Sequence, residues 1–420
     1  MVPAKFEHPK SSREWFYDRL RQFLRFGSIG AFSAAVGFAT HVVFPMLRAL
    51  YRRRIHRGET IELGSLGGPP VRQTFTGLTS TPANLAPKPG RRRQAAHMKV
   101  AYPEPAYDFT YATPPISGNV VNGLGETTRR RADYVFFGDG YGRAWGKLDW
   151  FFQVMEPTII HRLITRLFWQ DRNRVGPVAH RQPGHLQPDD AAGQIKTWAK
   201  EAGASLVGIT PLTDTMRYHD FDQPWANAIC IGIPMDREDM VHTPSARSGV
   251  EIQRAYLEAN RIAIAVAKKI RALGWPARAS TNISPDATEV LHIPVALGAG
   301  LGQLGKHGSL LTREHGSNVR LAVVLTDMPA TADGPTDIGA EDFCANCRVC
   351  VDNCPPNAIF DEKQLVRGER KWYVDFDACV PYFAKTEGCG ICIQACPWSE
   401  PGRGFVLSDR LLARRARKSA

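Results

Sequence analysis

Cysteine is nearly absent from the first 340 residues of this 420-residue chain, where Cys230 is the only one. The other eight lie between Cys344 and Cys396, a stretch of 53 residues. A disulfide framework distributes its cysteines so that they connect distant segments, and this distribution excludes one. Cys230 belongs to the apolar stretch NAICIGIPM, which predicts an ordinary buried strand residue.

Long apolar runs are also scarce. One run of 22 residues has no formal charge, FGSIGAFSAAVGFATHVVFPML from Phe26 to Leu47. This length just suffices to span a bilayer as a helix, so we expect an N-terminal membrane anchor at 26–47. One alternative is a degenerate twin-arginine export signal in RLRQFLRF, where Leu20 replaces an arginine and no small-x-small cleavage site follows. The other is a buried or peripheral amphipathic helix.

The net charge of +12 is concentrated at the two ends of the chain. Residues 1–60 contain eleven Lys or Arg against four Asp or Glu, and the chain closes with DRLLARRARKSA. These basic residues flank an apolar run and are not interleaved with aromatic residues, which favours an anionic membrane surface and predicts no nucleic-acid partner. Arginines on both sides of the run cancel the orientation signal. We expect the catalytic part in the cytoplasm, where iron–sulfur clusters are built, with the membrane side left open.

Regular patterns begin near residue 186. Residues 58–145 are rich in proline and small polar residues without a persistent helical or strand period, and we expect residues 58–185 to form a Pro/Gly-rich extension that wraps over the body or links to it. Beyond it we expect helices over 188–204 and 249–274, the second capped by Gly274 in a left-handed conformation. We expect strands in SLVGITPL, NAICIGIPM and LAVVLTD. This alternation predicts a layered α+β body.

Two cysteine groups form the most specific motif of the chain. Their spacings are Cys344-x2-Cys347-x2-Cys350-x3-Cys354-Pro355 and Cys379-x9-Cys389-x2-Cys392-x3-Cys396-Pro397. Zinc typically uses two separated CxxC pairs, whereas this spacing is typical of bacterial ferredoxins, whose fourth cysteine binds the other cluster. We therefore expect two [4Fe-4S] clusters, one on Cys344, Cys347, Cys350 and Cys396, the other on Cys354, Cys379, Cys389 and Cys392. The long gap after Cys379 leaves another ligand or cluster type open there.

A glycine-rich loop precedes the cysteine groups. It contains Gly300-x-Gly302-x-x-Gly305, with Asp327 after the next strand, which formally fits a dinucleotide fingerprint. That fingerprint needs a strand directly before the first glycine, yet Pro294 interrupts the preceding run, and KHGS is a poor helix start. We therefore favour a loop whose backbone contacts some other large, flat cofactor.

Several motifs together resemble those of the corrinoid iron–sulfur reductive dehalogenases, closest to their catabolic branch. They are LGAGLGQLGKHGSLLTREHGSNVRLAVVLTDMP, DFCANCRVCVDNCPPNAI, KWYVDFDACVPYF and CGICIQACPWSEPG, and the resemblance covers roughly residues 186–404. It implies a nitroreductase-like body with a mixed sheet that binds cobalamin base-off, beside a ferredoxin-like module. The chain has no D-x-H-x-x-G signature, which is consistent with base-off binding without a histidine ligand. The related epoxyqueuosine reductases share this body and both clusters.

The resemblance also suggests roles for individual residues. Replacing carbon–halogen by carbon–hydrogen takes two electrons and one proton, and a tyrosine beside a cation suits the proton donor. Tyr256 takes the position of that donor and Lys306 that of its basic partner. Arg367 is a further cation facing the substrate, with Arg370 close enough to exchange roles. Cofactor contacts are expected from Asn282, Gly300, Gly302, Gly305, His307 and Gly308, although His307 fits a hydrogen-bonding role in the loop better than an axial ligand.

These expectations combine into a membrane-associated, cobalamin-dependent reductive dehalogenase that acts on an aromatic organohalide. The expected units are the anchor region 1–57, the extension 58–185, the corrinoid-binding domain 186–335, the two-cluster domain 336–404 and a basic tail 405–420. Electrons would come from a ferredoxin, a flavodoxin or a reductase. An epoxyqueuosine reductase-like tRNA-modifying enzyme and a membrane-tethered ferredoxin-type electron carrier are the two alternatives. Trp372 and Trp398, which flank the cysteine groups, are expected to cover the clusters from water.

Overall fold

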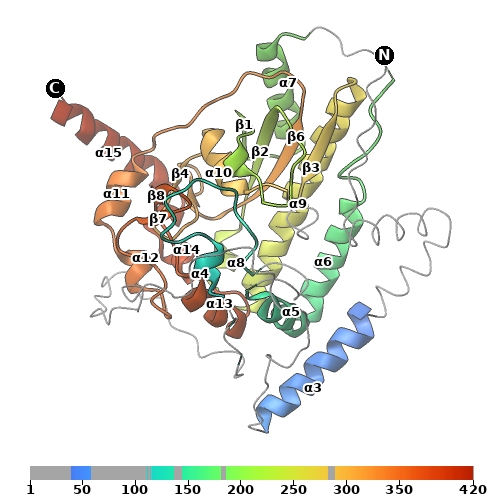
Figure 1. The fold of residues 1–420 in the computed structure, drawn as a ribbon, viewed down its shortest axis with the longest axis vertical. Coiled ribbons are helices and arrows are strands. Elements are labelled where there is room, and N and C mark those ends of the chain that lie inside the picture. The colour runs from blue at the N-terminus through green and yellow to red at the C-terminus, as the bar shows by residue number, and fades with distance from the viewer. Residues whose placement is uncertain are drawn as a thin grey trace.

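A computed structural model describes residues 39–57, 111, 114, 116–136, 144–180, 186–281 and 289–419. A four-stranded sheet forms the centre of the molecule, and a long helix, α9, crosses it (Figure 1). The segments that contain the cysteines pack beside this body. The fold is α+β, as the sequence predicts.

The central sheet has the strand order β1-β2-β6-β3. Its strands are β1 (Leu206–Pro211), β2 (Asn227–Pro234), β6 (Val319–Thr326) and β3 (Ala277–Ser280). The three strands expected from the sequence are confirmed as β1, β2 and β6. The expectation of a mixed sheet is wrong, because every neighbouring pair is antiparallel. β2 and β3 run in the same direction, but β6 lies between them.

Helices cover both faces of this sheet. Helices α7 (Pro188–Glu201) and α9 (Ala246–Ala272) lie on one face, and α10 (His292–Gly298) lies on the other. Strand residues alternate between the two cores, so that Ile229, Ile231 and Val324 face α9 while Cys230 and Val323 face α10. Cys230 is therefore a buried core residue, as predicted. Both faces are apolar, which explains why the strands read as continuous hydrophobic runs.

Helix α9 positions the part of the body nearest to the cysteines. Its N-cap Ser245 and Ser248 form a capping box, which satisfies backbone N–H groups at the start of the helix. Gly274 follows its end with φ +89°, the left-handed cap predicted from the sequence. Just before it lies α8 (Arg237–Met240), whose Arg237 donates to the side-chain oxygen of Gln394, 2.5 Å away, beside the cysteines.

The extension contains more regular structure than the sequence suggests. Helix α4 (Gly118–Val121) forms within residues 58–145, where no helical period is expected from the sequence, and α5 (Gly146–Met155) and α6 (Thr158–Asp171) form in the rest of the extension. Helix α5 is apolar and buries Phe151 completely against the helix that carries Cys379. Because the apolar partner comes from a distant part of the chain, packing decides these helices more than local propensity.

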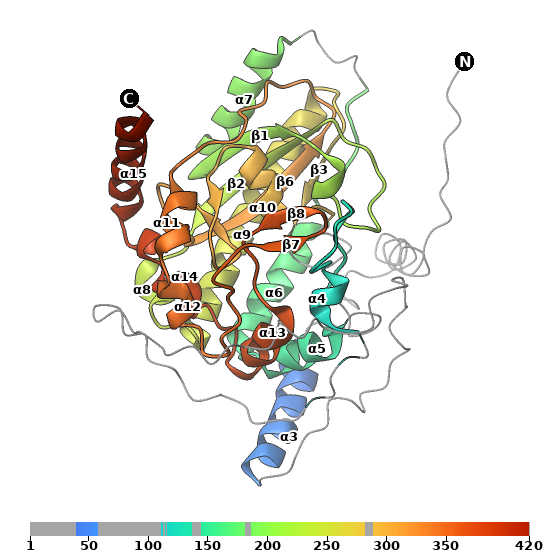
Figure 2. The ribbon, with the colours of Figure 1, turned by 60° about the vertical axis from the view of Figure 1, so that its left-hand side comes forward.

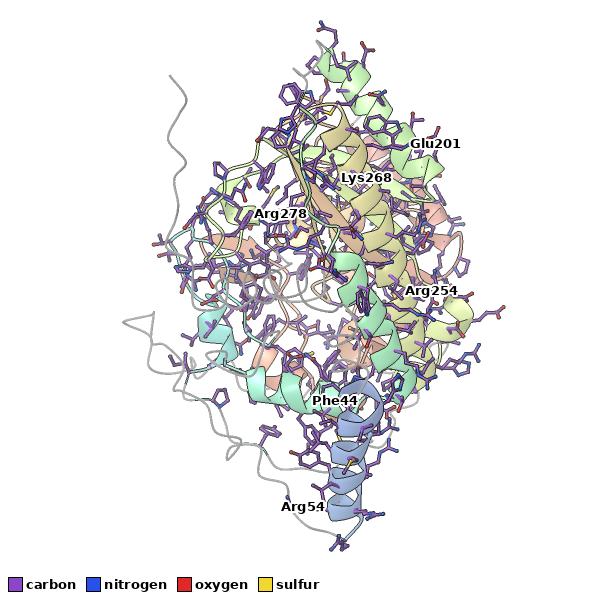
Figure 3. All side chains as sticks on the ribbon, turned by 90° about the vertical axis from the view of Figure 1, so that its right-hand side faces the viewer. Phe44, Arg54, Glu201, Arg254, Lys268 and Arg278 are labelled. Carbon is purple, nitrogen blue, oxygen red and sulfur yellow. The ribbon has the colours of Figure 1, made fainter. Side chains whose placement is uncertain are left out.

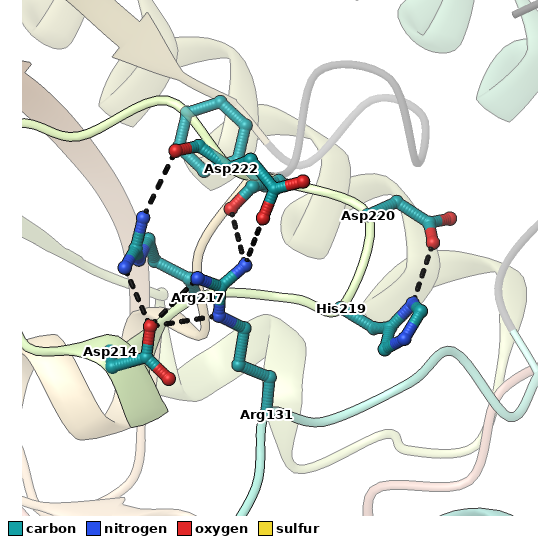
Figure 4. Close-up of polar contacts among 7 residues, drawn as sticks. Arg131, Asp214, Arg217, His219, Asp220 and Asp222 are labelled. Atoms are coloured by element: carbon teal, nitrogen blue, oxygen red, sulfur yellow. Dashed lines mark hydrogen bonds and ion pairs between the residues drawn. The ribbon is translucent and has the colours of Figure 1, made fainter.

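Polar contacts fasten residues 116–136 to the rest of the molecule. Asn119 is buried and donates to Asp375 over 2.7 Å, and the Trp145 indole donates to Asp377 over 2.7 Å. At the other end, Arg131 donates to Asp214 and to Asp222 (Figure 4). The first contacts reach the cysteine-bearing segments and the second reach the connection between β1 and β2. This stretch therefore bridges the two parts of the molecule.

The described N-terminal residues are helical and lie against the body. η1 (Ala39–Val43) continues into α3 (Phe44–His56), where Tyr51 packs edge-on against Phe151 with ring centroids 5.5 Å apart. Figure 3 shows Phe44 where α3 meets the body and Arg54 toward the far end of the helix. Most of the predicted anchor 26–47 lies outside the described residues. Within the described ranges, none of the helices combines the length and the apolar character needed to cross a bilayer.

The C-terminal quarter supplies short elements and one long helix. They are α11 (Ala340–Asn346), α12 (Val349–Asp352), β7 (Gln364–Val366), β8 (Glu369–Lys371), α13 (Phe376–Lys385), α14 (Ile391–Ala395), η6 (Pro397–Ser399) and α15 (Arg403–Ser419). The hairpin β7–β8 lies between the sheet body and α13, next to α4 (Figure 2). The expected basic tail 405–420 is largely helical, as α15, and packs against α11.

Candidate iron–sulfur and catalytic site

The eight cysteines of residues 344–396 form two groups of four in space. Burial raises the pKa of Cys350, and the nearby charges of Cys396, Cys347 and Cys344 raise it further. Burial likewise raises the pKa of Cys392, followed by the nearby charges of Cys389, Cys379 and Cys354. We call these sets group 1 (Cys344, Cys347, Cys350, Cys396) and group 2 (Cys354, Cys379, Cys389, Cys392). The two groups have the same members as the two ligand sets predicted from the ferredoxin pattern, with Cys354 and Cys396 exchanged between the groups, and the ligand roles themselves stay a prediction.

Local structure explains this grouping. Cys344 and Cys347 lie at the end of α11, and Cys350 lies in α12, which follows directly. The three sulfurs are therefore close together in space. Cys389, Cys392 and Cys396 surround α14 in the same way, and α12 packs against α14. Cys379 joins group 2 from α13. The nine-residue gap after Cys379 is therefore spanned by the end of α13 and the turn that follows it.

Burial keeps these thiols protonated when no metal is bound. Burial, with smaller contributions from neighbouring thiols, raises the pKa of Cys344 and Cys389 to about 11 and that of Cys379 to about 12. All eight are free cysteines without disulfides. In the described ranges, no three His, Cys, Asp or Glu side chains are placed to share a single metal ion. The donor set, four buried or half-buried thiols per group, suits thiolate-bound iron–sulfur clusters, and iron binding would release the thiol protons.

Trp372 and Trp398 pack with the cysteines of group 1. Both are buried in one apolar cluster with Cys344 and Cys396, and Phe343 meets the Trp398 ring edge-on with centroids 5.9 Å apart. This packing places both tryptophans where the predicted covering role needs them, and that role stays a prediction. A dry surrounding allows nearby charges and dipoles to act strongly on the potential of a cluster.

The glycine-rich loop is a tight turn of the chain's own backbone. β4 (Gln303–Leu304) and β5 (Leu310–Leu311) form a hairpin around it, and a side chain at Gly302 would collide with the Leu311 carbonyl. Gly300, Gly302 and Gly308 have positive φ, which other residues seldom adopt. Helix α10 precedes the loop where the dinucleotide fingerprint requires a strand, so that motif is excluded.

His307 is held inside this loop. Its Nδ1 accepts the Ser309 N–H at 3.2 Å, so Nε2 carries the hydrogen and donates to Ser317 Oγ at 3.1 Å. Burial lowers the pKa of His307 to about 4, so the ring is neutral at pH 7. Both ring nitrogens are engaged within the protein, which argues against a metal-ligand role and agrees with the hydrogen-bonding role.

Lys306 points toward group 1. Its side chain is 2% exposed, and its ammonium lies 5.0 Å from the centroid of the Trp372 ring. The backbone N–H of Lys306 hydrogen-bonds to the Cys344 sulfur, and the ammonium charge lowers the pKa of both Cys344 and Cys347. Lys306 is therefore a buried cation beside one cysteine group.

Tyr256 lies in α9, and a different cation is beside it. The guanidinium carbon of Arg320, on β6, is 5.2 Å from the centroid of its ring. Among the contacts of the described residues, none joins Tyr256 to Lys306. Arg320 Nε is buried and has no hydrogen-bond partner in the described part of the chain. The sequence signal that marks Arg320 is its place as the only charge in the strand VRLAVVLT.

Asn260 follows Tyr256 by one helical turn and therefore lies on the same side of α9. Its side chain is completely buried, and neither its amide nitrogen nor its oxygen has a hydrogen-bond partner in the described structure. An unpaired buried amide group costs roughly 1–3 kcal/mol, so a water molecule or a bound ligand is expected to satisfy it. Buried Asn260 and half-buried Tyr256 therefore lie on the same side of α9, and Arg320 is the cation beside the Tyr256 ring.

A second cationic set lies on the hairpin β7–β8. Arg367 donates to the Asn122 carbonyl at 2.5 Å, and burial, followed by nearby Arg130, lowers the pKa of Arg367. Burial and the charge of Arg367 also lower the pKa of Lys371. Arg370 is exposed, so Arg367 is the arginine that turns inward. Asn282 lies outside the described residues.

Comparisons with known proteins agree with this geometry. The family model of the 4Fe-4S dicluster domain matches residues 343–399. The tetrachloroethene reductive dehalogenase of Sulfurospirillum multivorans is 27% identical over 267 residues, 52% of each chain. The epoxyqueuosine reductase of Escherichia coli (strain K12) is also 27% identical over 267 residues, 51% of this chain and 66% of that protein.

A solved structure shares the fold. It is the catabolic reductive dehalogenase NpRdhA in complex with 3-bromo-4-hydroxybenzoic acid, with a TM-score of 0.58 and 25% identity over 69% of this chain and 48% of that one. The predicted resemblance to reductive dehalogenases is confirmed, and the relatives are oxidoreductases. The chain spans about half or less of the reductive dehalogenases that it matches.

Proposed function

We propose that this protein is a reductive dehalogenase that replaces the carbon–halogen bond of an organohalide with carbon–hydrogen. The net reaction takes two electrons and one proton and releases a halide ion. The observation that carries the proposal is the pair of four-cysteine groups next to a body shared with reductive dehalogenases. Two [4Fe-4S] clusters on these groups would supply the electrons one at a time.

Cobalamin is the second cofactor of the proposal. The unpaired buried polar atoms of Asn260 and Arg320 show that the body has hydrogen-bonding capacity that the protein itself does not use, which fits a bound polar group. When bound, cobalamin supplies a strongly reducing metal centre for cleavage of the carbon–halogen bond. Contacts from Asn282 and from the loop of Gly300, Gly302, Gly305 and Gly308 stay predictions.

The proton would come from the Tyr256 hydroxyl. A phenol can release it only if the phenolate that remains is stabilised in its low-dielectric surroundings. Arg320 is the cation beside this ring, so we assign it the stabilising role that the resemblance gave to Lys306. Lys306 is directed toward the cysteines of group 1.

The substrate class follows from the cations on β7–β8. Arg367 and Lys371 are both partly buried, and a neighbouring cation lowers the pKa of each: Arg130 that of Arg367, and Arg367 that of Lys371. An anion between them would relieve this repulsion. A halogenated aromatic compound that carries a carboxylate or a phenolate fits the site, and NpRdhA binds a molecule of that kind. A ferredoxin, flavodoxin or reductase as electron donor, the membrane anchor and the cytoplasmic location complete the proposal.

An epoxyqueuosine reductase-like activity is the second candidate, favoured by the similarity that covers two thirds of the Escherichia coli enzyme. One experiment separates the two. The full chain, loaded anaerobically with iron, sulfide and cobalamin and reduced chemically, is supplied with halogenated hydroxybenzoates, halogenated alkanes or an epoxyqueuosine-containing tRNA stem-loop. Halide release from the aromatic acids supports the proposal. Turnover of the RNA without halide release would establish the second candidate, and the electron-carrier alternative predicts turnover of neither.

A further inference from the structure

The surroundings of the two cysteine groups differ in charge. Group 1 has two cations beside it. The backbone N–H of Lys306 bonds to the Cys344 sulfur, and its ammonium lies over the ring of Trp372, which packs with Cys344. Arg237 donates to the side chain of Gln394, two residues before Cys396. In group 2, the charges that act on Cys379 come from Cys354, Cys389 and Asp375, all of which are negative when ionised. The asymmetry is built into the fold, since the cations come from the body and Asp375 caps α13.

Backbone and ring contacts fix the position of Lys306. The hairpin of β4 and β5 fixes the backbone of its loop, with the Gly305 N–H bonded to the Ser309 carbonyl at 2.8 Å. Trp372 provides the face of its ring to the ammonium, and the backbone N–H of Lys306 bonds to the Cys344 sulfur. At 2% exposure water screens the charge poorly, so its influence on a neighbouring charge is larger than that of a surface lysine.

We propose that buried Lys306 raises the reduction potential of the cluster on group 1 above that of the cluster on group 2. Reduction adds one electron, and hence one negative charge, to a cluster, and a fixed cation favours the more negative state. The electron then moves from the reduced group 2 cluster to the oxidised group 1 cluster, and no bond forms or breaks. Group 1 is the store of electrons closest to the glycine-rich loop of the body.

This inference rests on the two-cluster part of the proposed function and is independent of the substrate and of cobalamin. A potentiometric titration followed by EPR, on the full chain reconstituted with iron and sulfide alone, measures it. Lys306→Gln removes the charge and Lys306→Arg retains it. Lys363→Gln is the matched control, because Lys363 lies 5.6 Å from the centroid of the same Trp372 ring but is 31% exposed and paired with Glu341.

In Lys306→Gln we expect one cluster to become harder to reduce, its ratio of reduced to oxidised form at a fixed potential falling about tenfold, which is about 59 mV for one electron. The other cluster is unchanged, Lys306→Arg titrates like the wild type, and Lys363→Gln shifts by less. The shifted signal should be the one that disappears in Cys347→Ser, a ligand variant of group 1, and should persist in Cys379→Ser.

Wild-type potentials in Lys306→Gln, or an equal shift of both clusters, would overturn the inference. If Lys306→Gln does not assemble both clusters, the same titration is carried out on Trp372→Phe. This variant keeps the lysine but alters the ring over which its ammonium lies. The same cluster must then shift alone, and an unchanged titration counts against the proposal. Iron content near four in the wild type would instead defeat the proposed function itself.

Discussion

Arg320 and Tyr256 form a cation–π pair between the sheet and helix α9, with the guanidinium carbon 5.2 Å from the ring centroid. The two residues are far apart in the sequence and come from elements that pack tightly against each other. The pairing gives the phenol of Tyr256 a cationic neighbour in a mostly apolar surrounding. A proton donor of the proposed kind needs such a neighbour.

Replacing Tyr256 by Phe removes only the hydroxyl. We expect Tyr256→Phe to keep both clusters and to lose about 10²–10⁴-fold in the rate of halide release, the usual contribution of a general acid. The measurement is halide release by the loaded chain, with iron content determined on the same sample. Tyr51→Phe, in α3, is the control and should retain the wild-type rate. Full turnover in Tyr256→Phe would exclude the donor role.

Arg320 should act through the phenolate. Arg320→Gln removes the cation beside the Tyr256 ring, so we expect the rate of halide release to fall, and Arg320→Lys, which keeps the charge, to restore part of it. The measurement is halide release by the loaded chain, with iron content determined on the same sample. A rate in Arg320→Lys no higher than that of Arg320→Gln would indicate a purely structural role.

Cys379 is the ligand with the irregular spacing. Cys379→Ser should lower the iron content from about eight to about four per chain, because group 2 loses a thiolate and group 1 keeps all four. Iron and sulfide analysis after anaerobic reconstitution measures this. Cys230→Ala changes a cysteine inside the sheet and should retain about eight irons. Eight irons in both variants would show that Cys379 is not a ligand.

A buried ion pair supports the body near the end of α6. Glu289, which is 3% exposed, lies 2.6 Å from both Arg174 and Arg278. Glu289→Gln removes the carboxylate that faces both arginines, and Asp171, 3.3 Å from buried Arg174, compensates only in part, so we expect a loss of about 3 kcal/mol in stability. Thermal unfolding measures this loss. Glu201→Gln is the control, because Glu201 is 63% exposed in its pair with Lys269, and its replacement should change the stability by less than about 1 kcal/mol. Equal melting temperatures for the two variants would contradict this.

Glu156 predicts a specific dependence of stability on pH. Burial, with the nearby charges of Asp149 and Glu387, raises its pKa from 4.5 to about 8. The folded protein therefore binds a proton that the unfolded chain releases between pH 4.5 and 8, so its stability declines through this window as the pH rises. The slope is about 1.4 kcal/mol per pH unit.

Glu156→Gln cannot titrate, so the stability of this variant relative to the wild type should increase from pH 5 to pH 8. Melting temperatures at pH 5, 6.5 and 8 test this. A constant difference between Glu156→Gln and the wild type would show that Glu156 is ionised in the folded protein.

The sequence predicts the elements whose signals are local. The cysteine groups depend on short spacings, and their membership in space, with Cys354 and Cys396 exchanged, is the one the spacing predicts. Strands β1, β2 and β6 and helix α9 show clear periods and caps. Helices α5 and α6 were missed because their apolar faces pack against segments far along the chain.

The pairing of Tyr256 with a cation shows the limit of sequence reasoning at the site. The resemblance named Lys306 as the partner, whereas contacts in space place Arg320 at the phenol and Lys306 at the cysteines. Residue type and order along the chain do not specify which of several buried cations faces which group. The cation that faces each group is determined by register in the sheet and by the direction of a loop, and both depend on the whole fold.

The most direct test of this account is the metal content and activity of a single sample. The full chain is loaded anaerobically with iron, sulfide and cobalamin, separated from unbound cofactor, analysed for iron and cobalt, and then supplied with reductant and 3-bromo-4-hydroxybenzoic acid. The account predicts about eight irons and one cobalt per chain, and bromide release. Protein that retains its iron and sulfide but binds no cobalt and releases no bromide would contradict it.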